Sequence, residues 1–562
     1  MTNTGIIGTS PSLTKGTDMT TMLVTNGPIY TLDPAKPLVE ALGIRDGIVC
    51  AAGSRADVLA ILGTPDTTLD LHGKAAIPGL TDAHVHIIAT GMTLRQVRLY
   101  GYTDFAEVCK TIGATDDRLP DGVWLQGGGW DHTLWGGYWP TADDLEKLCP
   151  GRPALLSRKD GHSAWVNHTA MKIAGIDRHT ADPEGGHIDR DANGNPTGIF
   201  KETAINLVRQ HIPDTTDEDR RAAVTDAFAE GYTYGMVGMH SLTGTRRDGY
   251  NDLRNFQYMR EHGKLPGRIL VQMDPDGFEH MLGLGLRSGL GDDWLRIGAF
   301  KFFADGTLGS ETADMLAPFE GGTNLGLPTM SREEIFDNAR RANQNGIAIS
   351  VHCIGDGANR KVLDAIEAAL KPMQQPGESL AATAMRSLAL PNRIEHCQLL
   401  DPTDIPRFAA MNVVASMQPV HMIGDLDTAQ RLWGKRNATS YAWRSVELSG
   451  AVLALGSDAP VESLNPWLSI YGAVTRRKLD GTPAAGWYPE QALTRLSTLR
   501  GFTVGAAYCS NSHTRQGTLM PGMVADLAVM KHDPFACDAS QLQHNTAHLT
   551  MIEGTIVYRN DF

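Results

Sequence analysis

Side chains of the kind that bind metals recur along this chain, and each of them directly follows an apolar run. Such runs are typical of buried strands. In a (β/α)8 barrel, side chains at the carboxyl ends of successive strands converge on one point, where barrel enzymes do their chemistry. The pattern therefore favours a barrel with a metal site of the hydrolase type at its mouth. The residues are His84 and His86 in the segment 81–86, then Lys301, His352, His396 and Asp458.

Strand-like and helical patterns alternate through the middle of the chain. Residues 332–345 have a helical pattern and lead into the apolar run before His352, and residues 358–370 are helical again. This alternation predicts an α/β fold with a (β/α)8 TIM barrel over residues 79–514. A barrel takes about 250 residues. The chain has 562 residues and therefore has room for further domains.

Both ends of the chain are predicted to be β structure. Short apolar runs flank Asn26-Gly27 and Asp46-Gly47 near the start, and Glu553-Gly554 near the end. Such pairs are hairpin turn signals. Each end alone has few strands with which to bury an apolar face, so two independent appendages are less favoured than one shared structure. We expect residues 22–78 and 515–562 to form one small β-sandwich, and residues 1–21 to be a disordered leader.

The stretch 95–230 interrupts the βα alternation. It is rich in glycine, tryptophan and aspartate, as in the segments 127–131 and 136–140. Long segments of this kind in a compact enzyme are often functional. We interpret 95–230 as an inserted subdomain that acts as a lid over the barrel mouth.

Charge and cysteine content narrow the classes of partner. The formal net charge of −14 disfavours nucleic acid and anionic membranes. The seven cysteines form no Cys-x-x-Cys pair, which favours a reducing cytoplasm over a disulfide framework. The first residues lack the pattern of a signal peptide, and no stretch reaches the roughly 20 apolar residues that cross a membrane. We expect a cytoplasmic protein that acts on a small molecule, and a homo-oligomer, most simply a dimer.

Several motifs, in order, resemble those of the amidohydrolase superfamily. The segment 78–86 is similar to the opening strand of that superfamily, and the segments 160–168, 182–186 and 194–199 resemble its YtcJ-like branch, which includes the N-substituted formamide deformylases. Further matches are 301–306, 351–356, 393–397 and 456–460. The resemblance runs from about residue 22 to the C-terminus. His168 departs from it, because a serine or another small residue is expected there, and this change would alter the lid or the pocket.

The resemblance implies a centre of two divalent metal ions, with zinc the first expectation. A lysine at the position of Lys301 is carboxylated by CO2 in this family, and the resulting carbamate bridges the two ions. His352 and His396 would bind the second ion. Asp458 would bind the first ion and accept the proton of the bridging water. The alternative for Lys301 is an ordinary ammonium paired with Asp305 or Asp458.

Simpler interpretations exist for the individual ligands. Two residues that lie two apart in a strand share a face, so His84 and His86 can reach one ion, but such a pair can also be a surface pair. A lone histidine such as His352 or His396 is more often a core residue. Asp458 could be the N-cap of a helix. The order of all six residues along the chain favours metal binding.

Other residues are candidates for contact with substrate. His162 and Asn167 lie in the inserted segment and could hydrogen-bond a substrate, and His240 follows an apolar run and could line the barrel mouth. Trp130, Trp139 and Trp433 could form apolar walls. Cys353 and Cys397 neighbour two ligand candidates, but adjacent side chains in a strand point to opposite faces, so we do not expect them to bind metal.

The combined interpretation is a metal-dependent hydrolase that cleaves a non-peptide C–N bond of a small amide, such as an N-substituted formamide, by attack of a metal-bridging hydroxide. One alternative is a hydrolase of an ester, a carbamate or a cyclic amide on the same site. A deaminase commonly uses one metal without a bridging lysine, so Lys301 counts against it. The last alternative is a non-catalytic regulatory or binding protein on this fold.

Overall fold

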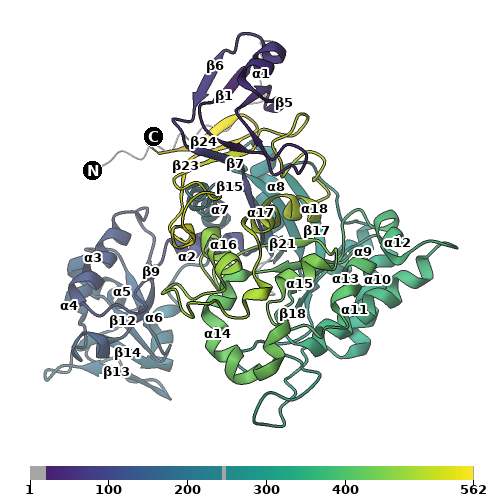
Figure 1. Ribbon diagram of the computed structural model, residues 1–562. Coiled ribbons are helices and arrows are strands. Elements are labelled where there is room, and N and C mark those ends of the chain that lie inside the picture. The colour runs from purple at the N-terminus through teal and green to yellow at the C-terminus, as the bar shows by residue number, and fades with distance from the viewer. Residues whose placement is uncertain (1–19, 243–248, 561–562) are drawn as a thin grey trace. The chain divides into compact units, whose positions relative to one another are not determined.

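The computed structural model describes residues 20–242 and 249–560 (Figure 1). Residues 1–19, which make up most of the predicted leader, lie outside the described residues, and Thr21 already begins strand β1 (Thr21–Thr25). The chain divides into two compact units. One unit contains the described residues up to 90 and from 224 onward, and the other contains residues 91–223.

The first unit contains a parallel sheet of eight strands, and the predicted barrel fold is confirmed. The sheet order is β21-β20-β19-β18-β17-β16-β15-β8, so each strand lies beside its neighbour in the sequence of barrel strands. Parallel strands buried on both faces read as continuous apolar runs, which is why the runs were visible in the sequence. The strands are β8 (Leu80–Val85), β15 (Met236–Leu242), β16 (Arg268–Met273), β17 (Leu295–Phe303), β18 (Ile349–Cys353), β19 (Arg393–His396), β20 (Val414–Met417) and β21 (Leu453–Leu455).

The two helices that flank strand β18 in the sequence have amphipathic patterns. Helix α10 (Arg332–Gln344) begins at a capping box in which Ser331 and Glu334 satisfy each other's backbone N–H groups. Helix α11 (Asp356–Leu370) buries one apolar face that includes Val362 and Ile366. No helix in the described ranges is long and apolar enough to span a membrane.

The first and last barrel strands meet through Asp82. Its Oδ1 accepts hydrogen bonds from the backbone N–H of His84 at 2.9 Å and of Ser457 at 3.1 Å. The backbone N–H of Asp458 donates to the carbonyl oxygen of His84 at 2.7 Å. Burial raises the pKa of Asp82 to about 6, although these hydrogen bonds lower it. These hydrogen bonds between β8 and the segment after β21 therefore place His84 and Asp458 side by side.

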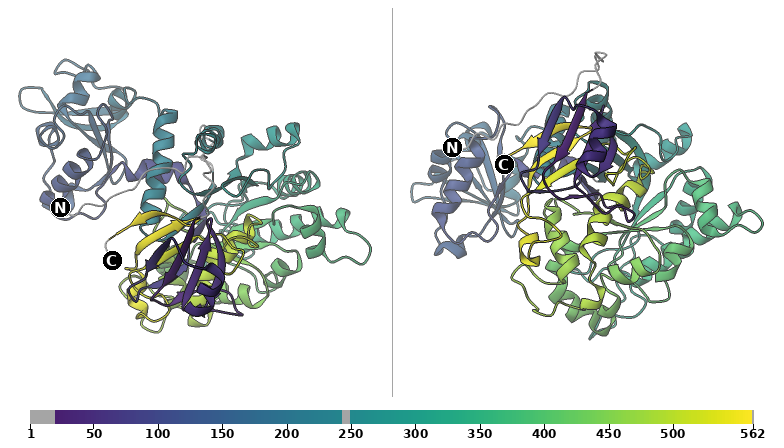
Figure 2. Two further views of the ribbon diagram at one scale, coloured as in Figure 1. Left: turned by 90° about the horizontal axis from the view of Figure 1, so that it is seen from above. Right: turned by 45° about the horizontal axis from the view of Figure 1, so that its top comes forward.

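A β-sandwich from both chain ends completes the first unit. One sheet has the order β5-β4-β1-β6, and the other has the order β24-β23-β22-β7-β2-β3. The N-terminal (purple) and C-terminal (yellow) strands lie side by side in Figures 1 and 2. Their bounds are β2 (Ile29–Tyr30), β3 (Leu38–Val39), β4 (Ala41–Arg45), β5 (Ile48–Gly53), β6 (Thr67–Asp70), β7 (Ala75–Pro78), β22 (Leu527–Met530), β23 (Ala547–Ile552) and β24 (Thr555–Arg559).

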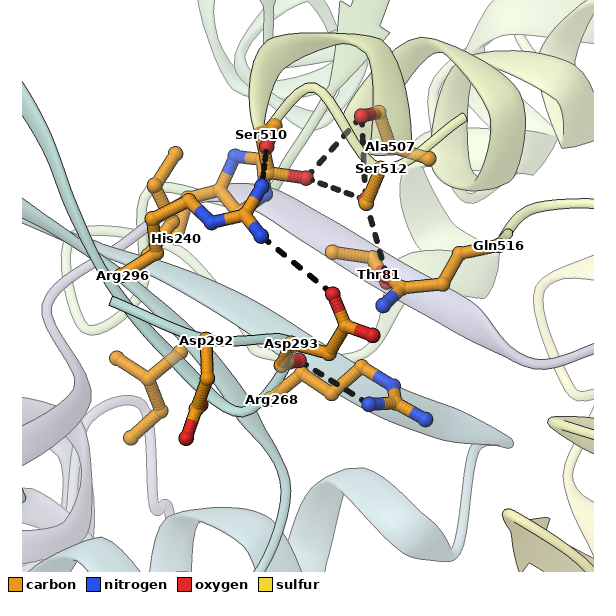
Figure 3. Close-up of a pocket in the computed structure, with 12 residues that line it drawn as sticks. Thr81, His240, Arg268, Asp292, Asp293, Arg296, Ala507, Ser510, Ser512 and Gln516 are labelled. Carbon is orange, nitrogen blue, oxygen red and sulfur yellow. Dashed lines mark hydrogen bonds and ion pairs between the residues drawn. The ribbon is translucent and has the colours of Figure 1, made fainter. Parts of the chain in front are cut away.

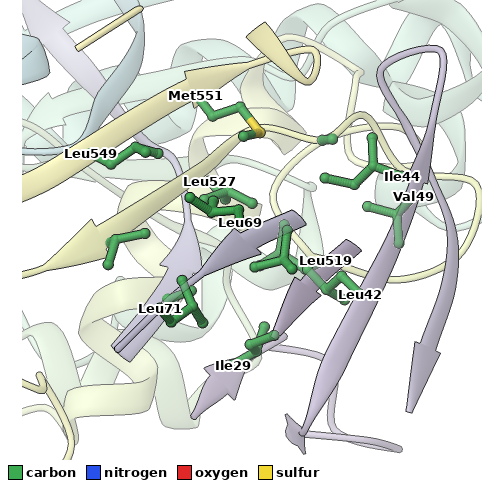
Figure 4. Close-up of a cluster of buried hydrophobic side chains, with 14 of the residues drawn as sticks. Ile29, Leu42, Ile44, Val49, Leu69, Leu71, Leu519, Leu527, Leu549 and Met551 are labelled. Carbon is green, nitrogen blue, oxygen red and sulfur yellow. The ribbon is translucent and has the colours of Figure 1, made fainter. Parts of the chain in front are cut away.

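The sandwich has its own apolar core. Leu42 and Leu69 from the start of the chain pack with Leu527 and Leu549 from its end, and all four side chains are buried (Figure 4). Burial of apolar surface from both ends in one cluster is what neither end could achieve alone.

A buried ion pair links the sandwich to the barrel. Arg268, the first residue of β16, donates from Nε to Oδ2 of Asp526 at 2.8 Å and from Nη2 to Oε1 of Glu553 at 2.9 Å. Arg268 and Asp526 are both buried. This contact lies at the amino-terminal ends of the barrel strands, which in this fold contribute to stability and not to catalysis.

The second unit, residues 91–223, has a sheet of its own with the order β13-β14-β12-β11-β10-β9. Two apolar clusters fill it, one around Phe200 and one around Trp130 and Trp165. Its role as a lid stays a prediction. The strands are β9 (Val97–Arg98), β10 (Leu125–Trp130), β11 (Ala154–Arg158), β12 (Ser163–Val166), β13 (Gly186–Arg190) and β14 (Pro196–Glu202), and the longer helices are α3 (Phe105–Asp116) and α4 (Ala142–Leu148).

Candidate metal centre

The structure brings all six predicted ligands to the carboxyl ends of the barrel strands. They line one pocket of about 420 Å³. Because strands far apart in the sequence end at the same edge of the barrel, their terminal side chains share this space. Their role as ligands stays a prediction. His84 lies in β8 and His86 directly after it, Lys301 in β17, His352 in β18, His396 at the end of β19, and Asp458 in the segment after β21.

Three of these side chains already have the spacing of a metal site. One ligand atom each of His84, His396 and Asp458 lies within 4.8 Å of the others. Oδ1 of Asp458 is 3.2 Å from Nε2 of His84 and 3.5 Å from Nε2 of His86. The ring centres of His352 and His396 are 4.5 Å apart. A divalent ion binds nitrogen and oxygen ligands at about 2 Å, so donors with this spacing can share one.

The backbone at two of the ligand candidates is left-handed. His396 has φ 72° and Asp458 has φ 62°, in a region that costs non-glycine residues free energy. In a regular strand Glu395 and His396 would point to opposite faces. Here Oε2 of Glu395 and the ring of His396 both contact His84, at 2.6 Å and at 4.8 Å between ring centres. The left-handed turn therefore directs two consecutive side chains into the barrel.

Lys301 is buried in the pocket wall, and its Nζ has no hydrogen-bond partner in the described part of the chain. The ordinary-lysine alternative requires an ion pair of Lys301 with Asp305 or Asp458. No such pair is found among the described residues. Burial lowers the pKa of Lys301 to about 8, against the opposing effect of the Glu395 and Asp458 carboxylates. An amine with a lowered pKa is readily neutral, which is the form that reacts with CO2.

The histidines and Asp458 have the protonation states that metal binding requires. Burial and the charge of Lys301 lower the pKa of His352 to about 3, and burial with neighbouring His352 and His84 holds the pKa of His396 well below its usual value. Both rings are therefore neutral near pH 7. Burial alone would raise the pKa of Asp458, but the facing histidines hold it well below its usual range.

A buried charge network beneath the site was missed in the sequence. Nδ1 of His84 is 2.6 Å from Oε2 of Glu395, and Nε of Arg393 is 2.6 Å from Oε1 of Glu395. Ser350 Oγ donates to the same Oε1 at 2.6 Å. A carboxylate behind a ligating histidine fixes its tautomer and orientation. The sequence held only a weak signal for this, since Glu395 lies directly before His396.

The pocket also contains residues that the sequence reasoning overlooked. His421 lies near the start of helix α14 (Pro419–Trp433), and its Nε2 is 3.2 Å from Oδ2 of Asp458. Asp425 of the same helix, Glu462 and Gln398 also line the pocket. His421 follows β20, so the rule that polar residues after strands converge at the mouth could have found it.

His240 lies elsewhere than predicted. It is buried inside the barrel, where Nη1 of Arg393 donates to its Nδ1 at 3.2 Å. It lines a different, smaller pocket with Thr81 and Arg268, toward the amino ends of the strands (Figure 3). The reason is that β15 continues through Ser241 and Leu242, so His240 does not reach the carboxyl end of its strand.

Trp130 and Asn167, which were also predicted to contact substrate, lie in the interior of the second unit. Trp130 is fully buried, and its Nε1 donates to the carbonyl of Leu156 at 2.8 Å. Asn167 is buried as the N-cap of helix α5 (His168–Ile173). Its Oδ1 accepts from two backbone N–H groups, and its Nδ2 donates to the carbonyl of Arg152 at 2.8 Å. Substrate contact is therefore not supported for either residue, because Trp130 lies within an apolar cluster of the second unit and the polar atoms of Asn167 are already paired.

His162 is exposed, and its Nδ1 is 3.1 Å from the Glu202 carboxylate, so substrate contact by His162 stays a prediction.

The two other tryptophans considered as apolar walls differ in burial. Trp433 is fully buried and is not part of the pocket lining, whereas Trp139 is partly exposed in the second unit. Cys353 and Cys397 are buried free thiols outside the pocket lining, as expected of residues that do not bind metal.

A family model described as "Amidohydrolase family" matches residues 67–558. The chain belongs to this family. The match spans the barrel, the inserted unit and the part of the sandwich from β6 onward, and includes all six ligand candidates. The resemblance to amidohydrolases is therefore confirmed, and the chain is a member of a family of metal-dependent hydrolases.

Relatives of this amidohydrolase cover nearly its whole length. Protein LONG AFTER FAR-RED 3 of Arabidopsis thaliana is 33% identical, over 92% of this chain and 89% of the relative. The putative amidohydrolase YtcJ of Bacillus subtilis is 31% identical, over 95% and 98%. The N-substituted formamide deformylase of Arthrobacter pascens is 27% identical, over 96% and 99%. An uncharacterized metal-dependent hydrolase from Pyrococcus furiosus has a similar crystal structure, with a TM-score of 0.70 and 26% identity over 92% of this chain and 100% of that one.

Proposed function

We propose that this amidohydrolase cleaves the C–N bond of a small, non-peptide amide, with N-substituted formamides as the first substrate class. The observation that carries the proposal is the buried Nζ of Lys301, which has no hydrogen-bond partner in the described ranges although it shares a pocket with five histidines and Asp458. The relative named as an N-substituted formamide deformylase, which aligns with nearly the whole chain, supports the choice of bond.

The donor set fits two divalent ions, and we propose zinc. His84, His86 and Asp458 would hold one ion, and His352 and His396 would hold the other. Lys301, once carboxylated by CO2, would supply an anionic bridge. An unmodified lysine ammonium cannot do this, because it is a cation without an acceptor atom. Neutral imidazoles and carboxylates are ligands that suit zinc. When bound, the ions would acidify a water molecule and polarise the scissile carbonyl.

Side chains of the pocket would accept the proton of the attacking water and transfer it to the leaving nitrogen. The Asp458 carboxylate contacts His84, His86 and His421, which keep it ionised. It can therefore accept a proton from the attacking water. His421 contacts the other oxygen of Asp458 at 3.2 Å and faces the pocket, so it can stabilise the proton there or pass it on to the leaving nitrogen. Glu395 would hold His84 with Nε2 toward Asp458, because it occupies Nδ1.

The test is metal analysis of the purified protein combined with a matched substrate panel. The panel contains formamides, acetamides, the corresponding esters and carbamates, and cyclic amides. We expect two ions per chain and the highest kcat/KM on an acyclic amide. Preference for the ester, carbamate or cyclic members would redirect the proposal to those bonds. A fully metallated protein without any hydrolysis would favour the regulatory or binding alternative. Activity that survives His84→Ala would show that hydrolysis does not depend on the proposed metal centre.

The proposal includes a cytoplasmic location and a homodimer. All seven cysteines are free thiols, which suits a reducing compartment. Size-exclusion chromatography with light scattering tests the dimer, and a mass near that of one chain contradicts it.

A further inference from the structure

One wall of the metal pocket presents hydrogen-bond acceptors without donors to match them. Glu462, in the segment after β21, is half-buried, and no hydrogen bond or ion pair reaches its carboxylate from the described residues. Asp425 of α14 lines the same pocket and accepts one hydrogen bond, from the Tyr441 hydroxyl at 2.7 Å. Among the described residues that line the pocket, Lys301 is the only lysine or arginine.

Gln398 gives a second, independent indication of a ligand at this wall. Its side chain lines the pocket and is only 5% exposed, yet its Oε1 has no hydrogen-bond partner within the described ranges. A buried polar atom without a partner is costly, so such an atom in a pocket wall points to a missing ligand. Tyr441 holds this region together, since its backbone N–H donates to the carbonyl of Gln398 at 2.6 Å while its hydroxyl contacts Asp425.

The electrostatics of the wall favour a positive partner. Burial raises the pKa of Glu462, and the neighbouring carboxylates of Asp425 and Asp458 raise it further, against the opposing effect of His421. Like charges gathered in a half-buried site repel one another, and a bound cation relieves that repulsion. Apolar surface lies in the same pocket: Phe303 is 45% exposed and Val461 is 68% exposed. A hydrocarbon segment can cover this surface.

We propose that the substrate carries a protonated amine, which Asp425, Glu462 and Gln398 bind while its amide bond lies at the metal centre. The substrate class is thus an N-substituted amide whose substituent is a short alkyl chain that ends in an ammonium group. The inference rests on the proposed function for the bond that is cleaved, but the ammonium site itself is a separate property of the pocket wall.

Paired substrates of equal length test the inference. N-(ω-aminoalkyl)formamides with two to five methylenes are compared with N-alkylformamides in which a methyl group replaces the ammonium. We expect the cationic member to have at least a tenfold higher kcat/KM at the best length, because a hydrogen bond to a charged group contributes about that factor. Glu462→Gln and Asp425→Asn, which keep side-chain shape, should each reduce the ratio severalfold. Asp427→Asn is the matched control, since Asp427 lies on the same helix but is exposed and paired with Lys478.

A binding measurement separates this inference from the proposed function. Calorimetric titration of the metal-loaded protein with butylammonium chloride, against 1-butanol, should show binding that weakens in Glu462→Gln and not in Asp427→Asn. If no amide of the panel is hydrolysed but butylammonium binds in this way, the ammonium site stands and the amidase proposal fails. If formamides are hydrolysed with no preference for the cationic member, or with the same preference in Glu462→Gln, the ammonium site is wrong and the amidase proposal stands. Metal content and circular dichroism of each variant establish that it is folded.

Discussion

Nδ1 of His84 lies 2.6 Å from Oε2 of Glu395, and this contact ties the candidate metal centre to the charged interior of the barrel. The same carboxylate holds Arg393, which in turn contacts His240 and the carbonyl of Ala83. The orientation of His84, a candidate metal ligand, therefore depends on a buried ion pair. A substitution in the Arg393–Glu395 pair should therefore change both the metal affinity and the free energy of unfolding.

Glu395→Gln should weaken metal binding by roughly 10- to 100-fold, because the oriented carboxylate behind His84 is lost. It should also destabilise the fold by about 3–5 kcal/mol, because Arg393 is left as an unpaired buried charge. Metal content after dialysis and urea unfolding measure the two effects. Glu279→Gln is the control, since its partner Arg341 is at the surface, and it should cost less than about 1 kcal/mol. Wild-type values for both quantities in Glu395→Gln would contradict this role.

Lys301→Ala should lose metal occupancy and activity together, and a short-chain carboxylic acid in solution should restore part of both. Lys301→Glu should restore at best a little, because glutamate is shorter than carboxylated lysine. The pKa of Lys301 lies at about 8, so the reactive neutral amine increases as pH rises toward 8. Reconstitution of the apoenzyme with metal and bicarbonate should therefore be more complete at pH 8 than at pH 6. Metal uptake that is independent of bicarbonate at both values would exclude the carbamate.

Asp458→Asn should keep the fold and most of the metal but lower kcat by roughly 10²- to 10⁴-fold, the usual contribution of a general base. KM should change much less, because the proton transfer and not substrate binding is affected. Steady-state kinetics on metal-replete protein measure both. Near-wild-type turnover would show that another residue accepts the proton.

His421→Ala should lower kcat in a way that depends on the leaving group. His421 contacts Oδ2 of Asp458 at 3.2 Å and faces the pocket, so its loss should slow the departure of a basic alkylamine more than that of a nitroaniline, which needs little protonation. The ratio of kcat on the two amides is the measurement. An equal loss on both would assign His421 to positioning of Asp458 alone.

Arg268→Ala should destabilise the fold by about 3–5 kcal/mol without a change in metal content, because Asp526 would remain as an unpaired buried charge far from the pocket mouth. Arg260→Ala removes a partly exposed ion pair with Asp292 and should cost less than about 1 kcal/mol. Urea unfolding compares the two. Similar small losses would show that the sandwich does not depend on this contact.

The sequence predicted the barrel because its strands are buried on both faces and read as uninterrupted apolar runs. It predicted the sandwich because two turn-rich β segments at opposite ends each lacked a partner. The position of His240 was wrong in the sequence reasoning, since the end of β15 could not be placed to within two residues. The roles given to Trp130 and Asn167 were likewise not supported, because burial and backbone capping leave no mark in composition.

The sequence by itself determined that the six predicted ligands reach the barrel mouth, since a polar residue that follows a parallel strand is brought there by the fold. Only the tertiary structure decided how those side chains are oriented and charged. Glu395 meets His84 across 311 positions of sequence, and Asp82 joins β8 to the segment after β21. The lowered pKa of Lys301 arises from burial by residues of several strands. Contacts of this range depend on the closed barrel, because no local pattern specifies which distant strands become neighbours.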